Sequence, residues 1–234
     1  LGWEVLRRLH DEVVAPIAVR RTKGAWYRGW RLVSLDGSTL DVADSPDNEK
    51  TFGRPSASRG TSAYPQIRLL SLVENGTHVL FGTQLGGYGH SEIGLAHQIL
   101  PWLRQGMLCL GDRNFFSYDL WKKAQATGAD LVWRVKKNLR LPCEKRLADG
   151  SYLSTIYRSD KDRRQCGNGI VVRVIEYRLE GIAGAESIYR LLTTILDPGQ
   201  APAAELAALY HERWEIGVSS QGHIVQSVRD RPRP

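Results

Sequence analysis

Cysteine is scarce in this sequence of 234 residues, and Cys109, Cys143 and Cys166 are widely spaced, with no Cys-x-x-Cys pair. An odd number of cysteines without paired spacing argues against both a disulfide framework and a structural zinc site. The apolar runs are also short, whereas a transmembrane helix needs about 20 apolar residues. The opening residues, LGWEVLRRLH, contain no apolar region of a signal peptide. We therefore expect a cytoplasmic protein with no membrane partner.

The composition indicates a folded, basic protein. Hydrophobic residues make up 42% of the chain, which is enough for a sizeable core. The 32 Lys and Arg residues against 25 Asp and Glu residues give a net charge of +7, which favours a polyanionic partner such as nucleic acid. A solvated basic surface would give the same charge. Because the chain starts with Leu1 rather than Met, we expect an upstream segment to be missing.

The first half of the sequence predicts three strands and a helix. RLVSLDGSTLDV, from Arg31 to Val42, alternates apolar and polar residues and predicts a strand that leads into an Asp-Gly turn. Residues 43–65 are rich in Gly, Pro, Ser and Asp and predict a long irregular loop. QIRLLSLVE and THVLFGTQLG, separated by Asn75-Gly76, predict a hairpin. Ser91 is placed to cap a helix whose last turn Pro101 should kink.

The second half continues with a buried strand, a helix and a β-rich segment. GMLCLGD, residues 106–112, is a short apolar run typical of a strand buried on both faces, with Asp112 at its end. Ser117 is placed to cap the next helix, and LVWRVK predicts another buried strand. Three strand-like pieces follow, SYLSTIY, IVVRVIEYRLE and SIYRLLTTIL, and Pro202 opens a final helix. The order predicts an α/β fold with a mixed sheet covered by helices.

Two aspartates stand out by their positions. Asp36 is expected at the end of the first strand and Asp112 at the end of the buried central strand. Ligands of open α/β sheets bind beyond the carboxyl ends of the strands, so these carboxylates should converge there. Carboxylate oxygens on adjacent strands can hold Mg²⁺ or Mn²⁺, and a metal pair can promote phosphodiester cleavage. Each aspartate by itself is explained as well by a strand end or a turn.

Several separate stretches together resemble a known family. These stretches are DGSTLDVADSPDN, TFGRPSASRGTSAYPQIRLLSLVENGTH, LCLGDRNFFSYDLW and YHERWEI, in this order. From about Arg31 to Ile216 the chain resembles the insertion-sequence transposases typified by insertion sequence 4. The resemblance implies a ribonuclease H-like fold with a β-rich insertion before the last helix, and a metal site of two aspartates and a glutamate. Asp36 matches the first aspartate and Asp112 the second.

The resemblance also implies domain boundaries and partners. We expect a lead-in segment at 1–30, a catalytic core at 31–137 and 188–217, a β-rich insertion at 138–187 and an aberrant tail at 218–234. The implied partner is double-stranded DNA, both transposon ends and target, in a nucleoid-associated protein that acts as a homodimer. The implied cofactor is Mg²⁺ or Mn²⁺.

The third carboxylate of the resemblance is absent. In the family, the pattern Tyr-x-x-Arg-x-x-x-Glu is followed seven residues later by lysine; Tyr210 and Arg213 match it, but Gly217 and Ile224 stand at the other two positions. Successive residues of a helix are rotated by about 100°, so Glu215 would lie roughly 160° and Glu212 roughly 140° from position 217. Neither can replace the glutamate. We expect a frameshift or truncation near codon 217, and little or no strand transfer.

Basic side chains near these positions predict contacts with DNA phosphates. Arg134 and Lys136 alternate off the strand that follows Asp112, and the family carries a similar Arg-x-Lys. Tyr210 and Arg213 should share one face of the last helix, and the resemblance implies phosphate contacts for both. A buried tyrosine and a structural ion pair are the competing explanation for the last two residues.

Two other functions fit parts of the same pattern. A catalytically inactive remnant would retain DNA in a salt-dependent way and release no cleavage product. A glycosidase would use a carboxylate pair about 5 to 9.5 Å apart and need no metal. Dependence on added metal distinguishes this last function from the transposase.

Overall fold

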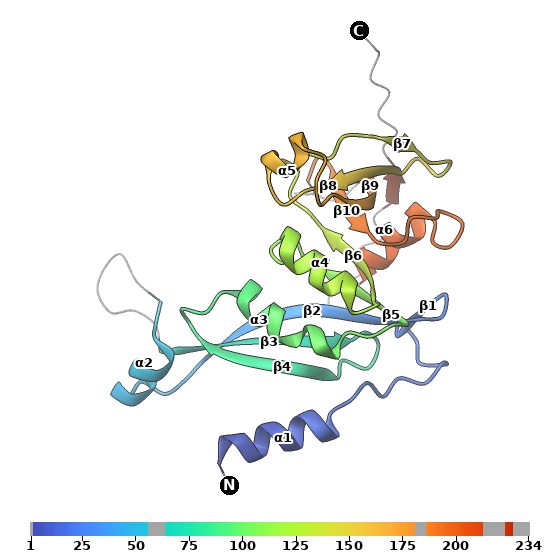
Figure 1. Ribbon diagram of the computed structural model, residues 1–234. Helices are drawn as coiled ribbons and strands as arrows, with labels where there is room; N and C mark the ends of the chain where they lie inside the picture. The colour runs from blue at the N-terminus through green and yellow to red at the C-terminus, as the bar shows by residue number, and fades with distance from the viewer. Residues whose placement is uncertain (1, 56–63, 181–185, 213–222, 227–234) are drawn as a thin grey trace. The chain divides into compact units, whose positions relative to one another are not determined.

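A computed structural model describes residues 2–55, 64–180, 186–212 and 223–226 (Figure 1). The chain divides into two compact units, which we call unit 1, Leu1–Met107, and unit 2, Leu108–Pro234. Each unit is described by itself.

Unit 1 is built on an antiparallel sheet of three long strands, with β3 in the centre. The strands are β2 (Trp30–Asp41), β3 (Gln66–Glu74) and β4 (Leu80–Gly87), and the short β1 (Trp26–Tyr27) pairs with β2. The helices are α1 (Trp3–Val13), α2 (Pro46–Phe52) and α3 (Glu92–Ile99), followed by the 3-10 turn η1 (Leu100–Trp102). Helix α3 packs on β3 and β4 through buried Leu95, Ala96 and Ile99 (Figure 1).

The hairpin predicted around Asn75-Gly76 is confirmed. Val73 pairs with Leu80, so residues 74–79 close the hairpin with a longer loop than a two-residue turn. Gly76 has a positive φ of 85°, and a Cβ there would lie 2.4 Å from the carbonyl oxygen of Lys23. Glycine is therefore required at this position by both its backbone angle and the close approach of the chain.

In unit 1, the predicted cap of α3 is confirmed and the predicted loop at residues 43–65 is partly wrong. Ser91 caps α3 as expected, because its hydroxyl accepts a hydrogen bond from the Gly94 amide, and Pro101 lies in η1 at the end of the helix. The irregular loop predicted for residues 43–65 is wrong for its first part, where α2 forms. Ser45 accepts from the Asn48 amide and Pro46 occupies the first helical position, which is the usual start of a helix.

A buried carboxylate ties the N-terminal segment to the sheet of unit 1. Glu74, fully buried at the end of β3, forms an ion pair with Arg31. It also accepts hydrogen bonds from the amides of Ile17 and Ala18, each at 2.9 Å. Burial lowers the pKa of Arg31 from its ordinary value. Burying a charge is unfavourable unless it is paired, so these bonds hold the 17–18 segment in place.

Unit 2 contains a mixed sheet. Its strands follow one another in the order β5 (Met107–Gly111), β6 (Asp130–Arg134), β10 (Tyr189–Thr193), β9 (Ile170–Glu180), β8 (Tyr152–Ile156) and β7 (Lys145–Arg146). β5 and β6 are parallel and the other neighbours are antiparallel; β11 (His223–Gln226) also pairs with β9. The helices are α4 (Tyr118–Ala126), α5 (Asp160–Arg164) and α6 (Ala203–Glu212).

The local signals of unit 2 are largely confirmed. Ser117 caps α4 by accepting from the Leu120 amide, and Pro202 directly precedes α6. Leu120, Trp121 and Ala124 form the buried face of α4, with the Trp121 ring edge-on to Trp133 of β6 at 5.4 Å. The segment predicted to be β-rich contains β7, β8 and β9, and it also contains α5, which was not predicted. The predicted α/β class with a mixed sheet and flanking helices is confirmed.

A buried arginine is the polar centre of unit 2. Arg173 of β9 is fully buried and donates to Ser151 Oγ and to the Ala201 carbonyl, each at 2.8 Å. It also forms an ion pair with Asp149, whose carboxylate accepts from the Ala203 amide at 2.8 Å. These bonds join β9, the 149–151 turn and the start of α6.

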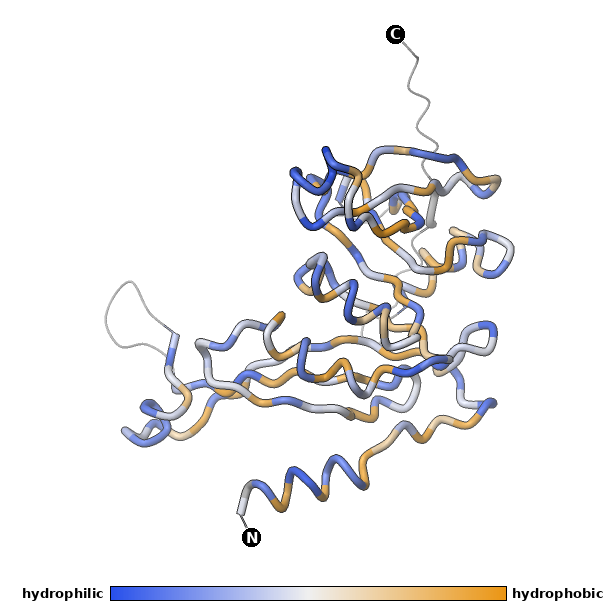
Figure 2. The backbone as a smooth tube through the Cα atoms, viewed as in Figure 1, coloured by the Kyte–Doolittle hydropathy of each residue, from blue (hydrophilic) through white to orange (hydrophobic). Residues whose placement is uncertain are grey.

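Figure 2 shows hydrophilic and hydrophobic residues alternating along α1, whose Val5, Leu6 and Leu9 are each more than half exposed. Among the described residues, no helix combines the length and hydrophobicity needed to cross a bilayer.

Candidate functional site

Asp36 lies in unit 1, in the middle of β2. β3 pairs with β2 from Val33 to Asp41, and Asp36 itself lies opposite Ser71. The predicted position at a strand end, with an Asp-Gly turn, is therefore wrong, because a full-length partner strand keeps the backbone extended. Gly37 serves close packing instead, since a Cβ there would lie 3.3 Å from Leu70 Cδ1. The Asp36 side chain is exposed and forms no ion pair with a described residue of unit 1.

Asp112 lies in unit 2, directly after β5, as predicted. Its Oδ1 accepts from the Arg113 amide at 2.6 Å, and its carbonyl accepts from the Phe115 amide at 3.0 Å. The preceding residue, Gly111, packs under Trp133, where a Cβ would lie 2.8 Å from the indole ring. The end of β5 is therefore closely packed. The half-buried Asp112 begins the backbone turn that follows the strand.

Arg134 ends β6, the strand parallel to β5, and is held by an ion pair. Its Nη2 lies 2.7 Å from Glu186 Oε1, and its guanidinium lies over the Tyr189 ring at 4.7 Å. Burial lowers the pKa of Arg134, but the hydrogen bond and charge of Glu186 outweigh it, and Asp112 adds a smaller attraction, so the net pKa is raised. Arg134 is a permanent cation in the electrostatic field of Asp112.

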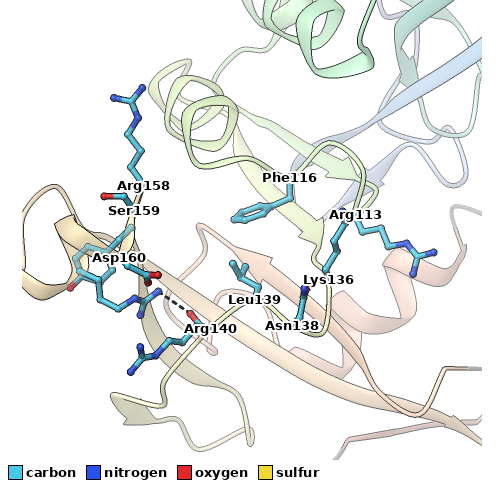
Figure 3. A pocket seen from close by; sticks show the side chains of 11 residues that line it. Arg113, Phe116, Lys136, Asn138, Leu139, Arg140, Arg158, Ser159 and Asp160 are labelled. Carbon is cyan, nitrogen blue, oxygen red and sulfur yellow. Dashed lines mark hydrogen bonds between the residues drawn. The ribbon is translucent and has the colours of Figure 1, made fainter.

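Lys136 is exposed and lines two neighbouring hollows of unit 2. One has a volume of about 450 Å³ and brings five cationic residues together. They are Arg113, Lys136, Arg140, Arg158 and Arg163, and we call them the basic groove. Figure 3 shows Arg113, Lys136 and Arg140 around this hollow with Phe116 and Leu139 between them, and the Arg163 guanidinium donates to the Arg140 carbonyl at 3.1 Å.

Tyr210 belongs to α6 and is buried, with 1% of its surface exposed. Its hydroxyl donates to the Gly111 carbonyl at 3.4 Å, directly before Asp112. This hydrogen bond ties α6 to the last residue of β5. Arg213, Glu215 and Gly217 lie outside the described residues, as does the helix that was predicted to continue past Glu212.

The chemistry of the donors suits a hard divalent cation, but the donor set is small. Asp36 and Asp112 offer carboxylate oxygens, the ligands that Mg²⁺ and Mn²⁺ prefer. Within the described ranges, no group of three or more His, Cys, Asp or Glu side chains is placed to hold a metal. Each of the two carboxylates therefore suits such an ion in kind.

A family model described as a transposase DDE domain matches residues 28–216, which is most of the chain. The chain belongs to the transposase DDE domain family. This chain is 26% identical over 221 residues to InsG, the transposase of insertion sequence element IS4 of Escherichia coli K12. The match covers 92% of this chain and 49% of InsG.

A second relative, the putative transposase InsZ of the same strain, is 28% identical over 169 residues, covering 72% of this chain and 50% of InsZ. The chain thus spans about half the length of each relative. Among solved structures, a piggyBac transposase synaptic complex with hairpin DNA aligns with a TM-score of 0.47 and 13% identity, over 79% of this chain and 38% of that one.

Three residues that lie near Asp112 or in the basic groove could not be picked out from the sequence. Arg113 was in view in the motif GDRN, but nothing marked it as more than a surface arginine. Glu186 lies 73 residues further along and carries no local signal. Arg158 likewise joins the basic groove only through the turn that follows β8.

Proposed function

We propose that this chain is the catalytic domain of an insertion-sequence transposase, with Asp36 and Asp112 as its metal-binding carboxylates. The observation that carries the proposal is the position of Asp112 directly after β5, beside the cations of the same unit. The family match supports both aspartates, since residues 28–216 include them. A divalent ion bound there would lower the pKa of water and neutralise charge that develops on a phosphodiester.

The protein's own residues would bind and orient the DNA. Lys136 is exposed and can contact a backbone phosphate, and Arg134 adds a fixed positive charge near Asp112. Arg213 is the third proposed phosphate ligand. For Tyr210, its burial supports a positioning role behind Asp112 more than a direct phosphate contact. We extend the proposal to transposon-end and target DNA as substrates and to a homodimer as the acting form, as the resemblance implies.

We further propose that this chain cleaves DNA poorly, because Gly217 replaces the third acidic residue. The alternative is a catalytically inactive, DNA-binding remnant, and the basic groove of unit 2 favours it specifically because these cations do not depend on position 217. Both functions predict DNA binding. They differ in whether restoring the acid restores cleavage.

Nicking of supercoiled plasmid DNA in Mg²⁺ tests the proposal. We expect slow or absent nicking by the chain itself and faster nicking by Gly217→Glu. Asp36→Asn or Asp112→Asn, added to Gly217→Glu, should abolish the gain, whereas Asp119→Asn, at an exposed position of α4, should not. Fast nicking by the unaltered chain that Asp36→Ala abolishes would refute the impairment. Gly217→Glu without nicking would favour the remnant.

A further inference from the structure

A single carboxylate oxygen in unit 2 is shared by two arginines. Glu186 Oε1 lies 2.7 Å from Arg113 Nη1 and 2.7 Å from Arg134 Nη2. Arg113 directly follows Asp112, and Arg134 ends the strand parallel to β5. The two guanidinium groups therefore converge beside the candidate catalytic aspartate, and an anionic oxygen already occupies the point where they meet.

The surroundings of this point favour an anion from outside the protein. A hollow of about 620 Å³ opens here. The residues that line it are Arg113, Asn114, Val135, Lys136, Lys137, Asn138, Glu186 and Ser187. Three of these described residues are cationic, and Glu186 is the one acidic residue among them. Arginine pairs bind phosphodiester oxygens with the same hydrogen bonds that they make to a carboxylate.

We infer that Arg113 and Arg134 form a phosphodiester-binding site and that Glu186 occupies it as an internal competitor when DNA is absent. The inference rests on the proposed function, since it needs DNA as the ligand. A backbone phosphate must displace the Glu186 carboxylate to reach both arginines. The Glu186 carboxylate therefore weakens the binding of any DNA whose phosphate does not contact both Arg113 and Arg134.

The exposure of the three groups is consistent with displacement. The Glu186 side chain is 40% exposed and Arg113 46%, so the carboxylate can leave toward solvent, whereas Arg134 is 17% exposed and is held over Tyr189. Partial burial raises the pKa of Glu186, but Arg134 and then Arg113 outweigh it, so its pKa lies below the ordinary value. Glu186 is thus ionised at neutral pH, and protonation does not release the arginines.

The test measures binding of a short DNA duplex to the full chain at low salt in EDTA, so that neither metal nor catalysis contributes. Glu186→Gln removes the competing charge, and we expect affinity to rise about 3- to 10-fold, the size expected for one exposed and one partly buried ion pair. Glu144→Gln is the matched control, because this exposed glutamate bonds to Thr155 and lies outside both hollows. It changes the net charge equally and should leave affinity unchanged.

A double-mutant cycle separates competition from a structural role of Glu186. Arg113→Ala should weaken DNA binding more in Glu186→Gln than in the unaltered chain, because only the former has a free Arg113 to lose. If Glu186 instead orients the arginines, Glu186→Gln weakens binding, which overturns the inference but leaves the proposed function intact. Unchanged affinity overturns it equally. If none of the variants binds DNA, the inference and the proposed function both fail.

Discussion

Units 1 and 2 present their candidate carboxylates in different settings. Asp36 projects from the middle of a paired strand, where no described side chain of unit 1 forms an ion pair with it. Asp112 follows the end of a strand and has Arg134 and Arg113 near it. Under the proposed function, unit 1 would therefore supply a ligand from within a paired strand, whereas unit 2 would supply a ligand together with nearby positive charge.

Each unit contains an ion pair with a fully buried partner, and the sign of the buried charge differs between the units. In unit 1 the fully buried partner is the acid, Glu74, and in unit 2 it is the base, Arg173. Both are tied to backbone groups of neighbouring segments. Each pair therefore fixes a chain segment that hydrophobic packing alone does not define.

Loss of the buried base should have the largest effect. Arg173→Met removes the ion-pair partner of Asp149 and the donors to the Ala201 and Ile195 carbonyls. We expect the free energy of unfolding to fall by about 3 to 5 kcal/mol. Urea denaturation followed by circular dichroism measures it. Arg178→Met is the matched control on the same strand, because Arg178 is exposed, and it should change stability little. Equal losses in the two variants would contradict the central role of Arg173.

The positive charge of unit 2 is the next test. Lys136→Ala with Arg140→Ala removes two exposed cations of the basic groove, and we expect the Kd for duplex DNA to rise about tenfold and the salt dependence to fall by about two counterions. Fluorescence anisotropy at several salt concentrations measures both. The control, Arg20→Ala with Lys50→Ala, removes two exposed cations of unit 1. A comparable loss in the control would remove the distinction between the units.

The smallest expected effect is the pH dependence that Asp149 contributes. Burial raises the pKa of Asp149, but hydrogen bonds from Ser151 and the Ala203 amide and the charge of Arg173 outweigh it, so the folded pKa lies below the ordinary 3.8. Such a carboxyl stabilises the fold above the unfolded pKa, and the stabilisation is lost as pH falls through the folded pKa. The stability difference between the unaltered chain and Asp149→Asn should therefore be constant near neutral pH and shrink below pH 3.8. Acid titrations of unfolding that run parallel for the two chains would contradict this.

Local signals predicted much of the fold. Ser91 and Ser117 cap the helices that they were expected to start, and the apolar run before Asp112 is a strand. These predictions succeeded because caps and buried strands are decided by neighbouring residues. Asp36-Gly37 was misplaced because pairing with β3 keeps the strand extended, and that pairing is a long-range contact that an Asp-Gly pair does not reveal.

The candidate site was predictable only in part, for the same reason. Asp112, Arg134 and Lys136 were identified from one stretch of sequence and its resemblance to a family. The shared carboxylate of Glu186 was not, because it reaches the two arginines through the sheet of unit 2 rather than along the chain. Short helices such as α5 were missed because Ser159 caps only five residues.

The proposed function depends most directly on binding of a divalent cation by the carboxylates of Asp36 and Asp112. Electron paramagnetic resonance of free Mn²⁺, titrated with the full chain, measures the bound fraction directly. We expect Asp36→Asn and Asp112→Asn each to lower Mn²⁺ binding. Asp119→Asn, which changes an exposed aspartate that pairs with Arg158, should leave it unchanged. Mn²⁺ binding that is the same in the unaltered chain and in both variants would contradict the claim.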